Sequence, residues 1–231
     1  MTGTYKLSPS HLTFLWDDCP RCFYLKVVRG LDRPWSGLPR IFNQIDGLMT
    51  GYFQGRSTAE ISPELPEGVI RHSQKWVTSV EIALPGHDSR CYISGRFDTV
   101  VAFSDGSYGV VDYKTSTPKP GHEDFYSRQL HAYAYALEHA AAGRFSLGPV
   151  SRLGLLVFEP SAMERAEDGR LAYLGEITWL ECPKDDDQFL GFLDRVLSVL
   201  EKPGGPPAAP SCAWCRMASV ISTPMALPVL P

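Results

Sequence analysis

Two Cys-x-x-Cys pairs stand near opposite ends of this chain, and they restrict its fold more than any other feature. The first pair is Cys19 and Cys22, and the second is Cys212 and Cys215. Each pair has the spacing with which two thiolates grip a metal. If both pairs bind one metal centre, the two ends of the domain, which lie about 190 residues apart in the sequence, must meet. The alternative is two unrelated pairs of thiols.

The composition is that of a globular domain with a full core. The chain has 231 residues, of which 44% are hydrophobic and 21% are charged, as in ordinary globular proteins. We expect residues 1–218 to form the domain and the proline-containing residues 219–231 to be an unstructured tail. No apolar run is long enough to span a membrane, and no signal peptide is visible. We therefore expect a cytoplasmic protein without a membrane partner.

A cytoplasmic location bears on the cysteines, because structural disulfides are rare in that compartment. Metal ligation is then the expected role of the four paired cysteines, whereas Cys91 and Cys182 lie in expected strands and suit core packing. Four thiolates fit either Zn²⁺ or an iron–sulfur cluster. The spacing alone does not choose between these two.

The charge is acidic overall but locally basic. A net charge of −4 argues against a uniformly basic, histone-like surface. Against the single acid Asp32, however, the region that begins at Cys19 carries five basic residues: Arg21, Lys26, Arg29, Arg33 and Arg40. Such a stripe can bind the phosphates of DNA. The alternative is a solvated surface on which these charges cluster by chance.

The hydrophobic periodicity predicts an α/β fold. Helical spacing predicts a helix that starts at Ser8-Pro9-Ser10 and further helices over residues 22–28, 40–54, 125–142 and 185–202. Strand patterns cover residues 76–84, 91–103, 108–115, 152–158 and 171–182, and the proline-rich residues 57–74 are expected to be irregular. This order predicts one mixed β-sheet flanked by helices.

Two carboxylates and one lysine fall together in this pattern. Asp112 and Lys114 are two residues apart in a strand, so they share one face. The hairpin places Asp98 on the neighbouring strand beside them. Asp98 and Asp112 can bind Mg²⁺ through their carboxylates, and the backbone carbonyl of Tyr113 could be a further ligand. A Mg²⁺ ion bound in this way promotes phosphodiester hydrolysis. Lys114 could orient the attacking water and stabilise the anionic transition state. An Asp-x-Lys triplet alone is common by chance, and a surface ion pair is its plain alternative.

The context of the triplet carries a family resemblance. Gly95-x-x-Asp98, Asp112-x-Lys114 and then Gln129-x-x-x-Tyr133 resemble the motif series of RecB-like PD-(D/E)XK nucleases. The resemblance implies a restriction-endonuclease-like core, a Mg²⁺ or Mn²⁺ site at Asp98 and Asp112, and a catalytic Lys114. It also implies contributions to the site from the last two residues of the series.

Two further comparisons with this family concern metals. Many RecB-like enzymes carry a metal-binding histidine on a helix before the first strand, but residues 40–54 contain none, and Asp46 is the better substitute there, ahead of Asn43. The segment from Ser8 to Leu25 with its Cys-x-x-Cys resembles iron–sulfur members of the superfamily, namely AddB-type subunits and the nucleases of CRISPR adaptation. This resemblance implies a 4Fe–4S cluster, while the two-plus-two cysteine arrangement departs from it and leaves Zn²⁺ open.

These patterns support a nuclease as the first functional hypothesis. The enzyme is expected to act on DNA, as an exonuclease on single-stranded ends, in DNA repair, recombination or defence. A helicase or a CRISPR-adaptation protein is the expected partner. The second hypothesis is an inactive scaffold that binds nucleic acid with the same fold and metal clasp. The third is a zinc-stabilised interaction module in which the Asp-x-Lys triplet is accidental.

Overall fold

The computed structural model describes residues 3–34 and 39–222. Within them, the strands form a four-stranded sheet in the order β1-β5-β3, with β4 also paired to β5, and a five-stranded sheet in the order β2-β6-β7-β8-β9. Both sheets are mixed, because β1 runs parallel to β5 and β7 runs parallel to β8 while the other pairs are antiparallel. The expected α/β architecture is confirmed, with two sheets in place of the single sheet predicted.

The strands follow the expected order along the chain. They are β1 (Thr4–Leu7), β2 (Gly68–Ser73), β3 (Trp76–Thr78), β4 (Ile82–Ala83), β5 (Arg90–Arg96), β6 (Thr99–Phe103), β7 (Tyr108–Thr115), β8 (Val150–Arg165) and β9 (Leu171–Cys182). The bounds of β7 and β9 are those predicted. Residues 57–74, predicted to be irregular, contain β2, and β8 extends well beyond the predicted residues 152–158.

A bend joins the two sheets and corrects one prediction. Residues 91–103 were expected to form one strand, but the chain turns at Phe97 and Asp98, so that β5 and β6 belong to different sheets. The segment between β2 and β3 turns beside it: Phe97 N donates to Lys75 O at 3.2 Å, and Gln74 N donates to Asp98 O at 2.9 Å. The bend therefore places Asp98 where the two sheets meet.

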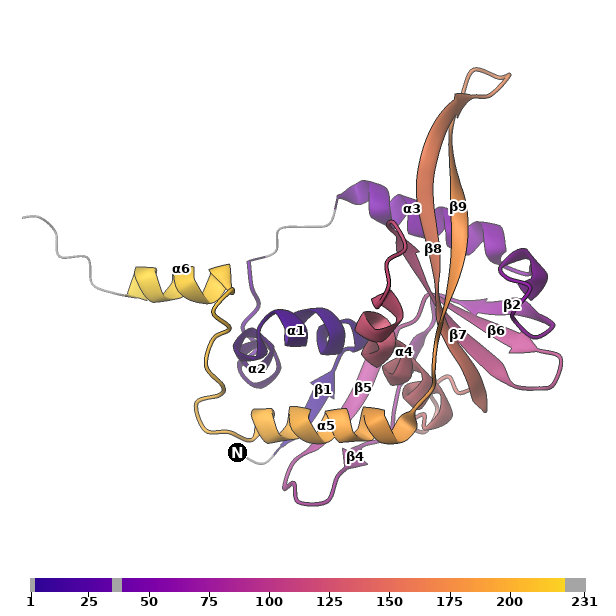
Figure 1. Cartoon of the computed structure of the whole chain (residues 1–231). Coiled ribbons are helices and arrows are strands. Elements are labelled where there is room, and N and C mark those ends of the chain that lie inside the picture. Colours follow the sequence, from indigo (N-terminus) through magenta and orange to yellow (C-terminus); the bar gives the residue numbers. More distant parts are fainter. Residues whose placement is uncertain (1–2, 35–38, 223–231) are drawn as a thin grey trace, which may run out of the picture.

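Helices lie on both faces of the five-stranded sheet, whereas the last helix stands apart from the sheets (Figure 1). They are α1 (Trp16–Asp18), α2 (Pro20–Arg29), α3 (Arg40–Phe53), α4 (His122–Glu138), α5 (Asp186–Leu200) and α6 (Ala213–Ser222), with a π-helical turn at His11–Leu15 and a 3-10 turn at Thr58–Glu60. Proline suits the first turn of α2, and the side chain of Asp185 caps α5 by accepting from Gln188 N at 2.8 Å. Residues 219–222 of the predicted tail belong to α6, and the rest of that tail lies outside the described residues.

Alternate residues of β7 face two different cores. Val111 and Tyr113 pack with Met49 and Phe53 of α3 in one cluster. Val110 belongs to the larger cluster, which includes the buried side of α4 and of α5. Because side chains alternate along a strand, the residues that share a face with Val110, among them Asp112, point toward α4. This sandwich of α3, β7 and α4 positions the site.

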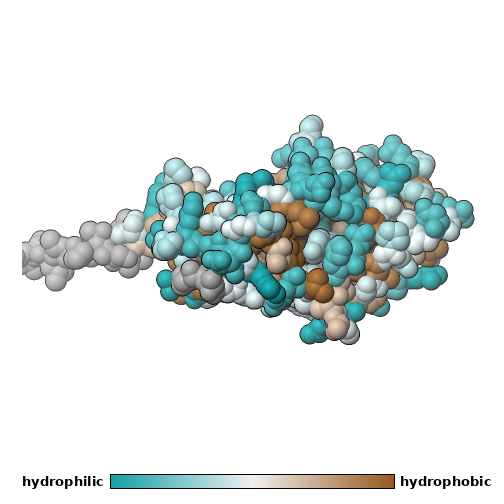
Figure 2. All heavy atoms as spheres, turned by 90° about the horizontal axis from the view of Figure 1, so that it is seen from below, coloured by the Kyte–Doolittle hydropathy of each residue, from teal (hydrophilic) through white to brown (hydrophobic). Residues whose placement is uncertain are grey.

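The outer half of the β8–β9 hairpin projects from the sheet as an arm (Figure 1). Seen from the side on which α5 lies, the surface is mainly hydrophilic, with hydrophobic residues in small patches between the polar ones (Figure 2). Among the described residues, no helix combines the length and the apolar character needed to span a membrane.

Candidate active site and metal centre

Asp112 and Lys114 meet on the α4 side of β7, as their spacing predicted. Their side chains form an ion pair, with 3% of the Asp112 side chain and 18% of the Lys114 side chain exposed. The other carboxylate oxygen of Asp112 accepts a hydrogen bond of 2.9 Å from Gln129 Nε2 of α4. The ammonium of Lys114 also lies 4.5 Å from the centre of the Tyr126 ring. Asp112 is thus a buried carboxylate held on both oxygens.

Asp98 reaches the same site from the bend between β5 and β6. Its Oδ2 accepts from the backbone N of Tyr113 at 3.0 Å, which fixes it against β7. Its Oδ1 accepts from Gln74 Nε2 at 3.4 Å. Burial first, and then the negative charge of Asp112, raise the pKa of Asp98 well above its usual range. The two carboxylates therefore repel each other in a poorly solvated place.

Asp46 belongs electrostatically to this group. It lies half-buried on α3, and its pKa is raised by burial first and then by the charge of Asp112. The pKa of Lys114 is also raised, but for a lysine this favours the charged form: burial disfavours its charge, and the charges of Asp112 and Asp98 outweigh burial. The site therefore combines three interacting acids with one lysine that stays protonated at neutral pH.

Tyr133 ties α4 to the end of β5. Its hydroxyl donates to the carbonyl oxygen of Arg96 at 2.8 Å. One residue before Arg96, Gly95 lets Pro9 and Tyr133 approach β5 closely: a Cβ there would lie 2.7 Å from Pro9 Cδ and 3.3 Å from a Tyr133 ring atom. The glycine of the Gly95-x-x-Asp98 motif is thus required by the packing of Pro9 and Tyr133 against β5.

Sequence reasoning missed two residues of the site. Gln74 precedes β3 and contacts Asp98 through both its backbone and its side chain, with a positive φ of 53°. Nothing in its local sequence indicates this position. Tyr126, by contrast, stands three residues before Gln129 and so shares its helix face. That spacing could have identified it.

Three other residues whose side chains can in general bind a metal have surroundings that differ from those of the carboxylates. Glu81 pairs with Arg90 at 3.2 Å on the surface. His72 packs its ring against Phe145, with ring centres 5.2 Å apart. Asn43 is exposed on α3.

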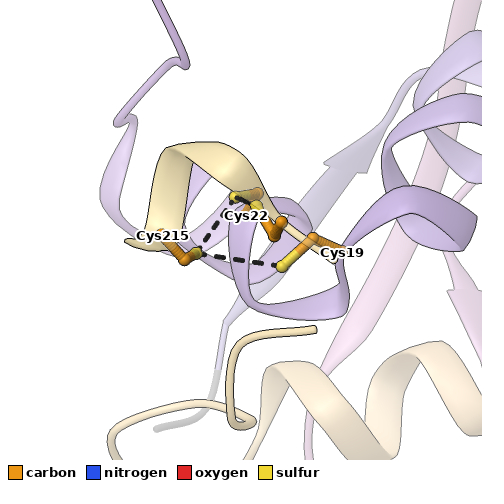
Figure 3. A group of neighbouring side chains, drawn as sticks. Cys19, Cys22 and Cys215 are labelled. Atoms are coloured by element: carbon orange, nitrogen blue, oxygen red, sulfur yellow. Dashed lines mark hydrogen bonds between the residues drawn. The ribbon is translucent and has the colours of Figure 1, made fainter. Parts of the chain in front are cut away.

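The four paired cysteines converge, as predicted, where α2 meets α6. The sulfur atoms of Cys19 and Cys215 lie 3.9 Å apart, and Cys22 lies 3.7 Å from Cys212 and 3.5 Å from Cys215. Figure 3 shows side chains from both helices pointing toward one another. In the described chain this is the one group of three or more His, Cys, Asp or Glu whose possible ligand atoms lie within 4.8 Å of one another.

Backbone and arginine groups surround the thiols. Ala209 N donates to Cys19 Sγ at 3.4 Å, and Arg33 Nη2 donates to Cys212 Sγ at 3.5 Å. Burial alone would raise the pKa of Cys19, but backbone hydrogen bonds from Ala209 and Cys22 outweigh it and lower the pKa to about 7. At least one thiolate is therefore available at neutral pH, as metal ligation requires.

The structure gives several residues of the predicted basic stripe protein partners. Arg33 pairs with Asp18, besides its contact with the thiols. Lys26 pairs with Asp32, and Arg21 donates to Pro206 O at 3.4 Å. Arg29 is exposed at the end of α2. Part of the stripe thus holds the cysteine-bearing ends together.

The carboxylates, the lysine and the mixed sheet that carries them agree with a comparison against protein families. Residues 39–220 match the model of the PD-(D/E)XK nuclease superfamily. The chain belongs to this superfamily. Membership of this superfamily supports the restriction-endonuclease-like fold and implies hydrolase activity of the nuclease type on a nucleic-acid substrate.

Further comparisons give less detail on this PD-(D/E)XK nuclease. No curated protein matches the chain. One similar solved structure is described as "Crystal structure of SSO0001"; its TM-score is 0.45 and its sequence identity 13%, and the similarity covers 86% of this chain and 78% of that one.

Proposed function

We propose that this chain is a RecB-like DNA nuclease that requires Mg²⁺ or Mn²⁺ and degrades DNA from single-stranded ends. The observation that carries the proposal is the gathering of Asp98, Asp112 and Lys114 on the α4 side of β7, with Gln129 and Tyr133 beside them. Nothing less than this set would distinguish a catalytic site from a chance Asp-x-Lys ion pair.

The charges of the site fit a divalent cation. Asp46, Asp98 and Asp112 carry three negative charges when ionised, whereas Lys114 carries one positive charge, which leaves two negative charges uncompensated. Carboxylate oxygens are the ligands that Mg²⁺ and Mn²⁺ prefer. We propose that Asp98, Asp112 and the carbonyl of Tyr113 are ligands and that Asp46 replaces the missing histidine. A bound divalent ion would supply Lewis-acid charge stabilisation and a nucleophilic water near neutral pH.

The remaining residues of the site would stabilise charge on the phosphate and keep the carboxylates in place. Lys114 stays protonated, so its ammonium would stabilise negative charge on the phosphate rather than act as a base. Gln129 holds Asp112 from the side opposite Lys114 and would keep that carboxylate in a fixed orientation. Tyr133 fixes the backbone two residues before Asp98 and would hold the bend in place.

The cysteines would form a separate, structural metal centre. A tetrahedral Zn²⁺ bound at about 2.3 Å holds its sulfurs about 3.8 Å apart. Three of the sulfur pairs are separated by 3.5–3.9 Å, close to this value, and all four sulfurs lie within 4.8 Å of one another. A 4Fe–4S cluster uses the same four thiolates but needs them further apart. The sequence resemblance supports the cluster and the sulfur positions support the single ion, so metal analysis of anaerobically purified protein is the deciding measurement.

The wider role follows from the same assignment. Exposed Arg29 and the other basic residues near the cysteine centre would contact DNA phosphates. The chain carries no helicase motif in its sequence, so unwinding would fall to a helicase or CRISPR-adaptation partner. DNA repair, recombination and defence are the processes that such an activity serves.

The test is cleavage of end-labelled single-stranded and double-stranded DNA with Mg²⁺ or Mn²⁺. We expect metal-dependent cleavage by the wild type, none by Lys114→Ala or Asp98→Asn, and wild-type cleavage by Lys202→Ala, which removes an exposed lysine from the far end of α5. A ladder from one end would support exonuclease action. If metal-loaded, folded wild type binds DNA but cuts neither substrate, the scaffold hypothesis replaces this one.

A further inference from the structure

A second polar hollow lies beside the carboxylate site but outside it. This groove, of about 660 Å³, is bounded by the four-stranded sheet and by the segments that lead into and follow the first helical turn. Its lining is rich in basic and hydroxyl groups and contains no acid. The lining residues that matter are Lys6, Ser10, His11, Trp76, Arg96 and Tyr133.

The strand register explains why these side chains share one surface. Trp76 of β3 lies directly opposite Arg96 of β5, and Lys6 of β1 lies opposite Tyr92 of β5. Directly paired residues project to the same face, as do residues four apart in one strand. Lys6, Arg96 and Trp76 therefore stand side by side on the face of the sheet that turns away from the core. The Lys6 ammonium lies 5.9 Å from the centre of the Trp76 ring.

The positive charge of the groove comes from two residues. Lys26 is paired with Asp32. The pKa of His11 is lowered, by burial first and then by Lys26, so its ring is neutral at pH 7. Lys6 and Arg96, by contrast, form no ion pair with any residue that the structure describes. Their charges are available to a ligand.

Trp76 is unusual for its size and place. The residue is 63% exposed, although a large aromatic ring gains most from burial. It stands within a basic groove instead of in a general apolar patch. Nucleic-acid strands with unpaired bases are recognised by this combination, in which bases stack on an aromatic ring while cations follow the phosphates.

The groove adjoins the nuclease site at Tyr133 and Arg96. Tyr133 lines the groove, and its hydroxyl bonds to the carbonyl oxygen of Arg96. Burial is the main cause that raises the pKa of Tyr133, and the charges of Asp112 and Asp98 raise it further. The charge of Arg96 acts in turn on Asp46, whose pKa it lowers. A strand whose phosphate lies at the carboxylates would thus meet Arg96 first and then Lys6 and Trp76.

We propose that this groove binds a single-stranded segment of the substrate beside the scissile phosphate, with Arg96 and Lys6 on its phosphates and Trp76 stacked on a base. The inference rests on the proposed nuclease function and identifies the surface that holds its single-stranded substrate. A duplex keeps its bases paired and stacked, so it cannot use Trp76 in this way.

The first experiment measures binding of a fluorescent oligothymidylate to the full chain by anisotropy, without added divalent metal so that no cleavage occurs. We expect Trp76→Ala to weaken binding about 5- to 100-fold, as loss of one stacked base does, and Trp76→Phe to restore most of it. We expect Lys6→Ala to reduce the slope of log affinity against log salt by about 0.7, the value for one phosphate of a single strand. A blunt duplex should compete poorly.

Matched controls are available on exposed surfaces elsewhere. Lys202→Ala removes an exposed lysine at the end of α5, and Tyr173→Ala removes an aromatic side chain that is 57% exposed on the β8–β9 arm. Both should bind the strand as the wild type does. Wild-type affinity and salt slope in Trp76→Ala and Lys6→Ala would overturn the proposal, as would equal competition by the duplex.

A second assay separates this proposal from the nuclease itself. Bis(p-nitrophenyl) phosphate is a small diester that needs the carboxylate site but not the groove. We expect Trp76→Ala and Lys6→Ala to hydrolyse it at the wild-type rate and Lys114→Ala not to hydrolyse it. If the wild type does not hydrolyse the diester while the groove variants no longer bind the single strand, the nuclease function is refuted and the binding role of the groove is supported. If the wild type hydrolyses the diester and the variants bind the strand as it does, only the binding role of the groove is refuted.

Discussion

Gln129 on α4 donates a hydrogen bond of 2.9 Å from Nε2 to Oδ1 of Asp112 on β7. This bond connects a helix and a strand through two buried side chains, and Lys114 occupies the other oxygen of the same carboxylate. The orientation of Asp112 therefore depends on α4 as much as on its own strand.

We predict that Gln129→Met lowers kcat for DNA cleavage about 10- to 100-fold, with a smaller effect on KM. Methionine has a similar length but no donor, so Asp112 would lose its fixed orientation, at a cost of about 1.5–3 kcal/mol for a hydrogen bond to a charged group. Steady-state kinetics and urea unfolding measure the two effects. Gln188→Met, at an exposed position of α5, is the control. An unchanged kcat in Gln129→Met would mean that Asp112 is positioned without α4.

A second prediction concerns the close approach at Gly95. The Cβ of Gly95→Ala would lie 2.7 Å from the rigid ring of Pro9 and 3.3 Å from Tyr133. We expect a loss of about 1–3 kcal/mol in the free energy of unfolding, typical of overpacking, together with reduced cleavage as Tyr133 shifts. Gly191→Ala in α5 meets nothing within 4 Å and should stabilise the protein by about 1 kcal/mol. Equal effects of the two substitutions would refute this account of Gly95.

A third prediction concerns the dependence of stability on pH. His87 contacts Glu201 through Nδ1 at 2.9 Å and Asp194 through Nε2 at 3.0 Å, so both ring nitrogens can donate to a carboxylate when the ring is protonated. The hydrogen bond to Glu201 is the main cause that raises the pKa of His87 above 6.5, and the same bond lowers the pKa of Glu201 below 4.5. The contribution of His87 is complete below 6.5 and is lost as pH rises through its raised pKa. That of Glu201 is complete above 4.5 and is lost as pH falls through its lowered pKa.

The stability difference between wild type and His87→Ala should therefore be largest between pH 4.5 and 6.5. We expect about 1 kcal/mol there, because Asp194 is solvent-screened. Urea unfolding across a pH series measures it. Glu201→Gln keeps an acceptor without the charge and should flatten the profile. A difference that stays constant from acid to alkaline pH would show that His87 contributes by packing alone.

Comparison of the predicted and observed elements shows what local sequence can reveal. The bounds of β7 and β9 were predicted because long runs of apolar and β-branched residues specify a strand wherever it packs. The break between β5 and β6 was not, since Phe97 favours a strand and one aspartate, Asp98, does not by itself end a run of β-branched and apolar residues. It arises from pairing with Gln74 and Lys75, which are distant in sequence. The strand β2 was missed because the preceding prolines indicated a loop.

The same distinction applies to the candidate site. Asp112 and Lys114 could be placed together from the two-residue period of a strand, and Gln129 and Tyr133 from the turn of a helix. The contact of Arg33 with the thiols could not, because it depends on how α2 meets α6. The raised pKa of Asp46 likewise depends on the packing of α3 against β7. Roles set by periodicity were predictable, and roles set by tertiary contacts were not.

The last prediction concerns the cysteine centre, which joins α2 to α6 across a loop of about 190 residues. The chain-entropy model gives about 5 kcal/mol for a crosslink that closes so long a loop. We expect Cys215→Ser to lose the bound metal, to lower the free energy of unfolding by several kcal/mol and to expose the segment around Gly204 and Gly205 to protease. The carboxylate site lies on other elements, so the small diester should still be hydrolysed. Cys91→Ser changes a buried thiol of the apolar core that lies outside the four-cysteine group, and it should retain the metal. Full metal content and wild-type protease resistance in Cys215→Ser would show that the four thiols do not act as one centre.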